Sequence, residues 1–141
     1  MNLDLVVLLY VAGILHLGLI AAGLMMPRVV GIRGHLATLP VFLRQLFWVY
    51  YSFIGLCLVS FGVITVVFAE TLAGGTLFAR AICTFFALFW TVRLIAGTFV
   101  FDLGPYLTNP ARRIGLAAAN IVFAYLPIVY AIAAIQPAWA K

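Results

Sequence analysis

Charged residues are scarce in this chain: only 8% of its 141 residues are Asp, Glu, Lys or Arg. Soluble domains usually carry about 25% charged residues, and a chain this short of charge could not keep its surface in water. The chain is also 67% hydrophobic, with a mean hydropathy of +1.27. The shortage of charge therefore excludes an ordinary soluble domain and predicts lipid as the solvent for most of the chain.

Acidic residues are the rarest charges, at three against eight basic ones, which gives a net charge of +5. Such an excess could indicate nucleic-acid binding, but the basic residues do not form one patch along the sequence. Their placement is better explained by orientation in a membrane. We therefore predict no nucleic-acid partner.

Cysteine and histidine are equally few, with two of each. Cys57 and Cys83 belong to no CxxC motif and are expected to be small apolar core residues. The chain has no HExxH motif, no Cys/His metal cluster and no paired carboxylates. A bis-histidine haem would need His16 and His35 to face each other at one depth, and His35 falls in a predicted link. The sequence identifies no cofactor and does not favour an enzyme.

Long apolar runs are the main positive feature. Segments of about 20 apolar residues can cross a bilayer, and four qualify, at 3–26, 42–69, 77–101 and 111–135. The first run begins with an acidic residue and is too long for a signal peptide, so we expect a retained span. Short links make successive spans antiparallel neighbours. The sequence predicts one all-α membrane domain over residues 1–141, an up-down bundle of four transmembrane helices.

Residues at the span ends predict where helices start and stop. Pro27 is expected to end the first span, and Asn109 and Pro110 to cap and begin the fourth. Within the spans, small residues are expected to let helices pack closely, among them Gly13 and Gly23 in the first span and Gly55 and Gly62 in the second.

Basic residues near the span ends also predict orientation. Arg28, Arg33, Arg44, Arg112 and Arg113 lie beside the first and third links, whereas the other side holds only Arg80 and Lys141. Because positive residues are retained in the cytoplasm, both termini are expected on the non-cytoplasmic side. Trp48 and Trp139 suit the two interfacial belts. The size and four-span layout resemble those of small bacterial inner-membrane proteins, so we expect a multi-pass protein of a bacterial-type inner (plasma) membrane.

Arg93 is the most specific functional signal, because it lies about two-thirds of the way through the third span. A cation at that depth is costly and must face protein or water. Counting from the span ends puts other polar and aromatic side chains at a similar depth on all four spans. We predict that they form one ligand-binding site: Arg93, His16, Trp90, Gln45, Trp48, Ser52, Asn120 and Tyr125.

Structural roles compete with this interpretation. Arg93 could extend to the headgroups, His16 could bond to another span, and Gln45 and Asn120 could join helices by hydrogen bonds. Our leading hypothesis is a non-catalytic protein whose pocket binds a lipid- or quinone-like amphipath or docks a partner subunit. One alternative is a small homo-oligomeric transporter or channel with His16 as the titrating group. Another is the membrane subunit of a redox enzyme.

Overall fold

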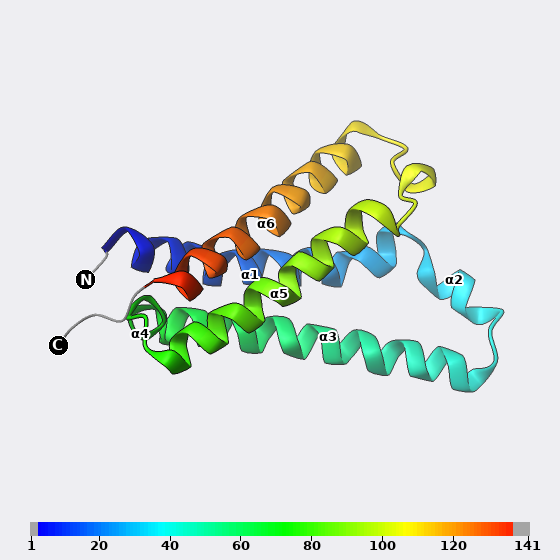
Figure 1. Cartoon of the computed structure of the whole chain (residues 1–141). Coiled ribbons are helices and arrows are strands. Elements are labelled where there is room, and N and C mark those ends of the chain that lie inside the picture. The colour runs from blue at the N-terminus through cyan, green and yellow to red at the C-terminus, as the bar shows by residue number, and fades with distance from the viewer. Residues whose placement is uncertain (1–2, 137–141) are drawn as a thin grey trace.

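Four long helices dominate the computed structural model, which describes residues 3–136 (Figure 1). The elements are α1 (Leu3–Val29), α2 (Ile32–Ala37), α3 (Val41–Val67), α4 (Ala69–Ala73), α5 (Leu77–Phe99), the 3-10 turn η1 (Gly104–Tyr106) and α6 (Pro110–Ile135). The four helices α1, α3, α5 and α6 are each long and apolar enough to cross a membrane. The predicted all-α membrane protein with four spans is confirmed. Trp139 and Lys141, used above to predict orientation, lie outside the described residues.

Helix α1 extends further than its sequence predicts, because it continues through Pro27 to Val29. Proline has no N–H, so it cannot bond the carbonyl oxygen four residues earlier. That carbonyl belongs to Gly23, and the hydroxyl of Tyr51 on α3 donates to it instead. The Gly23 carbonyl is therefore satisfied without the missing N–H, and α1 continues to Val29.

The start of α6 follows the prediction. The Asn109 side chain accepts a hydrogen bond of 2.9 Å from the backbone N–H of Arg112, and Pro110 is the first helical residue. A second cap was not predicted: the Thr76 hydroxyl accepts from the N–H of Ala79 at 3.2 Å and begins α5. Both caps satisfy N–H groups that a helix start leaves without partners.

The helices form two antiparallel hairpins, α1 with α3 and α5 with α6, and α1 also contacts α6. In Figure 1 the hairpins lie together where α4 is, and α6 rises away from α3 toward the end that holds α2 and η1. We call these the α4 end and the α2 end. The bundle is thus packed at one end and splayed at the other.

Burial follows the same division. In the four long helices, the buried residues lie no further toward the α2 end than Leu19 on α1, Phe61 on α3, Trp90 on α5 and Leu126 on α6. These four residues mark a border across the bundle. We call the part of the bundle between this border and the α4 end the closed half, and the part between the border and the α2 end the open half. The Phe61 ring connects α3 to α5 through Phe85, Phe86 and Phe89.

Two glycines allow α1 and α3 to approach closely in the closed half. A Cβ at Gly13 would lie 2.4 Å from Cγ2 of Val66 and 3.3 Å from the carbonyl oxygen of Gly62. A Cβ at Gly62 would lie 3.0 Å from the Cβ of His16. The predicted packing role is confirmed for these two glycines, whose crossing brings the His16 side chain against α3. It is not confirmed for Gly23 and Gly55, where an added Cβ would meet no described atom within 4 Å.

Candidate functional site

His16 lies at the centre of the bundle and is fully buried. Its Nδ1 is 2.7 Å from the carbonyl oxygen of Ala12, one turn earlier on α1. Its ring meets the ring of Trp90 on α5 at a centroid distance of 5.2 Å and the ring of Tyr130 on α6 at 6.3 Å, both edge-on. Through Gly62 it also touches α3, so this one side chain contacts the three other spans.

Trp90 lies beside His16 and is 1% exposed. Its indole ring stacks on Phe123 of α6, with centroids 5.8 Å apart and ring planes 25° from parallel. The Phe89 ring packs edge-on against the indole, with ring centroids 5.4 Å apart. Trp90 therefore connects His16 to the aromatic face of α6.

Arg93 follows Trp90 by one helical turn and is partly buried. Its guanidinium carbon is 4.5 Å from the centroid of the Phe123 ring and 5.4 Å from that of Phe101. At these distances the cation is attracted to the electron-rich ring faces. Nη1 passes 2.9 Å from the position that a Cβ on Gly97 would take. The side chain thus extends along α5 toward the α2 end while remaining in contact with α6.

His16, Trp90, Phe123 and Arg93 form a continuous series of ring contacts, which we call the ring ladder. Within residues 3–136, three buried side-chain nitrogens lack a hydrogen-bond partner: Nε2 of His16, Nε1 of Trp90 and Nη1 of Arg93. All three belong to the ring ladder. Buried polar atoms are normally paired, so their concentration in one cluster defines the candidate site.

The other predicted residues do not join this cluster in the way that we expected. Gln45, Ser52 and Asn120 are exposed. Trp48 packs against Phe47 and Tyr51 of its own helix, and the Ser52 hydroxyl donates to the Trp48 carbonyl at 2.9 Å. All four lie in the open half, where the hairpins diverge, so a shared depth does not bring them together. Their roles in ligand binding remain predictions.

Tyr125 has a structural contact with α1. Its hydroxyl donates to the carbonyl oxygen of Leu8 on α1 at 3.0 Å. A second contact between helices was not predicted: Thr65 on α3 and Tyr130 on α6 are bonded through their hydroxyls at 2.6 Å. Sequence reasoning also missed Phe123, because 15% of the residues are aromatic and no local pattern distinguishes this one.

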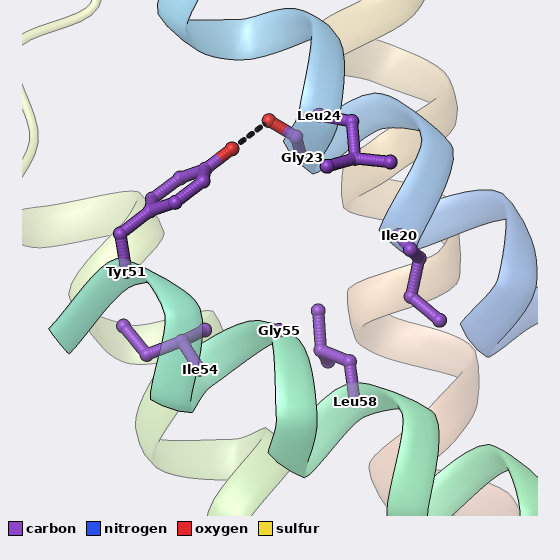
Figure 2. Close-up of a pocket in the computed structure, with 7 residues that line it drawn as sticks. All are labelled: Ile20, Gly23, Leu24, Tyr51, Ile54, Gly55 and Leu58. Carbon is purple, nitrogen blue, oxygen red and sulfur yellow. Dashed lines mark hydrogen bonds between the residues drawn. The ribbon is translucent and has the colours of Figure 1, made fainter. Parts of the chain in front are cut away.

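A small groove lies between α1 and α3 on the side of the open half (Figure 2). It has a volume of about 70 Å³ and is lined by Ile20, Gly23, Leu24, Tyr51, Ile54, Gly55 and Leu58. Its walls are apolar, and the Tyr51 hydroxyl is already bonded to Gly23. The groove offers apolar contact and no free polar group.

Metal ligands do not gather in the described part of the chain, where no three His, Cys, Asp or Glu side chains could hold an ion together. His35 is exposed on α2, whereas His16 is enclosed by the other spans, so these two histidines do not form a facing pair.

The fold and the site together define a multi-pass α-helical membrane protein with a cluster of buried nitrogens that have no partner within the described residues. Comparison with protein families, with curated proteins and with solved structures finds no match to this chain. The geometry of the site is therefore the basis for inferring function.

Proposed function

We propose that this protein binds an amphipathic, lipid-like molecule within the membrane and does not act on it chemically. The single observation that carries this proposal is the Arg93 guanidinium, which is partly buried and lies on Phe123, and whose Nη1 has no hydrogen-bond partner in the part of the chain that the structure describes. An arginine inside a membrane span is costly. A ligand headgroup would supply the hydrogen-bond acceptor that Nη1 lacks.

Guanidinium chemistry favours certain headgroups. Its planar set of N–H donors suits carboxylate, phosphate or paired carbonyl oxygens. Aromatic rings at Phe123 and Phe101 flank the same group and would contact the apolar part of a ligand next to its headgroup. Arg93 therefore suits an anionic or carbonyl headgroup attached to an apolar body, as in an anionic lipid or a quinone.

The apolar tail would lie along the diverging helices of the open half. Pockets for drug-sized ligands have volumes of about 300–1,000 Å³, so the groove of about 70 Å³ between α1 and α3 could take only part of an alkyl chain. The rest of the tail would contact bilayer lipid. We further propose that the α2 end faces the cytoplasm of a bacterial-type inner membrane, since five arginines lie near that end.

Native mass spectrometry of the purified full-length protein tests the proposal by measuring the masses of the amphipathic molecules that stay bound to the protein. We expect Arg93→Gln to lose a retained species that wild type holds, and Arg93→Lys to retain part of it, since lysine keeps the charge. The matched control is Arg80→Gln. Arg80 is exposed near the α4 end, where its Nε donates to the Ala134 carbonyl at 2.8 Å. The control removes one arginine and should leave retention unchanged.

Equal retention by wild type and Arg93→Gln would refute the proposal. Loss of a co-purifying protein in place of a lipid would instead assign Arg93 to docking a partner subunit. The transporter hypothesis, with His16 as the titrating group, and the redox-subunit hypothesis remain predictions from sequence.

A further inference from the structure

We infer that the bound molecule carries an un-ionised hydroxyl group, which donates a hydrogen bond to Nε2 of His16 and accepts one from Nε1–H of Trp90. This inference rests on the proposed function and deepens it. Arg93 selects an amphipath with an acceptor group, and the inner end of the ring ladder specifies a hydroxyl. Three steps lead to it: the tautomer of His16, the donor on Trp90, and the place of both in the bundle.

The first step is the tautomer of His16. Nδ1 lies 2.7 Å from the Ala12 carbonyl oxygen, and a carbonyl can only accept, so Nδ1 carries a hydrogen and donates it. The ring is fully buried, where its uncharged form is favoured. In an uncharged imidazole the other nitrogen has a lone pair and no hydrogen. Nε2 of His16 is therefore a buried acceptor that no donor among residues 3–136 satisfies.

The second step is the indole of Trp90. An indole nitrogen can donate and cannot accept, and Nε1 of Trp90 has no acceptor within the described chain. The two rings are in edge-on contact with centroids 5.2 Å apart, so the unpaired acceptor and the unpaired donor belong to adjacent side chains.

A hydroxyl group complements this pair because it has one hydrogen to donate and two lone pairs to accept with. A ketone, an ether or a carboxylate has no hydrogen for His16, and an ammonium group has no lone pair for Trp90. Two sources share the required chemistry: a phenol-type hydroxyl, as in a reduced quinone, and an aliphatic hydroxyl, as in a lipid alcohol. The rings of Phe123 and Tyr130 around the pair favour the phenol, because aromatic rings pack well edge-on or offset.

The third step is the position of the pair. Trp90 is the last buried residue along α5, and no residue of α6 before Leu126 is buried. The His16–Trp90 pair therefore lies where the closed half meets the open half, with Arg93 one turn further toward the α2 end. A ligand whose headgroup is held by Arg93 would have this pair one helical turn further toward the α4 end.

Isothermal titration of the purified full-length protein in detergent tests the inference with two matched probes, 4-octylphenol and its methyl ether 4-octylanisole. The two probes differ only at the oxygen, which carries a hydrogen in the phenol and a methyl group in the ether. We expect wild type to bind the phenol about 5- to 10-fold more tightly, the change that one neutral hydrogen bond produces. The same comparison with 1-decanol and its methyl ether separates a phenolic from an aliphatic preference.

Two variants test whether Trp90 and His16 cause the preference for the phenol over its ether. Trp90→Phe keeps an aromatic ring and removes the N–H, and His16→Phe removes the acceptor. Each should reduce the preference for the phenol over its ether. Should either variant fail to fold, wild type alone still decides: the ¹⁵N signal of His16 Nε2 should shift with octylphenol and stay unchanged with octylanisole.

Equal affinity of wild type for phenol and ether, or an unmoved Nε2 signal at saturating phenol, would overturn the inference. So would an ordered water found bonded to both nitrogens with octylphenol bound elsewhere. If Arg93→Gln still loses a retained amphipath in these cases, the proposed function stands and only the hydroxyl is refuted. If no probe binds and Arg93→Gln retains the same species as wild type, both fail.

Discussion

The hydroxyl of Tyr51 on α3 donates to the carbonyl oxygen of Gly23 on α1, the oxygen that Pro27 leaves without its usual helical partner. This bond crosses between helices in the open half, beside the apolar groove (Figure 2). The Tyr51 hydroxyl on α3 thus satisfies a carbonyl that α1 cannot satisfy itself. The effect of losing this hydroxyl should therefore depend on whether Pro27 is present.

We expect Tyr51→Phe to lower the free energy of unfolding by about 0.6 kcal/mol, typical of a hydrogen bond between membrane helices. The loss should shrink in a Pro27→Ala background, because alanine restores an N–H for Gly23. Unfolding in mixed micelles at increasing SDS measures all four proteins of this cycle. Tyr50→Phe is the control, since Tyr50 is 61% exposed. An equal loss with and without Pro27 would contradict the explanation.

The close crossing of α1 and α3 gives a second prediction. We expect Gly13→Ala to destabilise the protein by ~1–3 kcal/mol, the usual cost of overpacking, because the added methyl would meet Val66 at 2.4 Å. Gly18→Ala is the matched control on the same helix, where a Cβ would have no neighbour within 4 Å. The same SDS titration compares them, and comparable stability of the two variants would show that α1 and α3 do not approach so closely.

The buried hydroxyl pair gives a third prediction with a direction. Thr65 donates its one hydroxyl hydrogen to the Phe61 carbonyl at 2.7 Å, so the Tyr130 hydroxyl must donate to Thr65. Thr65→Val leaves the Tyr130 hydroxyl buried without an acceptor, at a cost of about 1–3 kcal/mol. Tyr130→Phe removes the donor itself and should cost only about 1 kcal/mol.

Thermal unfolding in detergent compares these two variants with Thr65→Ser, which keeps the acceptor and should stay nearest to wild type. A larger loss for Tyr130→Phe than for Thr65→Val would mean that the assigned direction of the bond is wrong.

The predicted orientation is tested by labelling single cysteines in intact cells with a maleimide that cannot cross membranes. Both native cysteines are first replaced, by Cys57→Ser and Cys83→Ala. We expect Thr71→Cys on α4 to be labelled from outside and His35→Cys on α2 to be labelled only after lysis; both positions are exposed. The reverse pattern would place the arginine-rich α2 end outside and refute the orientation.

Local features of the chain were predictable because the residues that cause them are close in sequence. Asn109 and Pro110 begin α6 as predicted, since a cap needs only its own helix start. Pro27 misled the prediction because the compensating Tyr51 lies 28 residues after Gly23, whose carbonyl it satisfies. A similar depth for His16 and Trp90 agrees with their ring contact, because the helices still meet at the border of the closed half.

The rest of the candidate site could not be derived from depth alone. Gln45 and Asn120 were grouped with Arg93 on the assumption that the helices stay parallel. Where the hairpins diverge, that assumption fails and both side chains are exposed. Phe123 was missed for the opposite reason, because only the crossing of α5 and α6 puts its ring under Arg93. The angle between helices depends on contacts distant in sequence, which periodicity does not reveal.

The splay of the two hairpins also bears on the surrounding bilayer (Figure 1). A body that is broader at one end takes up unequal area in the two leaflets, so its insertion energy depends on how tightly each leaflet is packed. Membrane composition and curvature should therefore set the angle at which the hairpins stand apart.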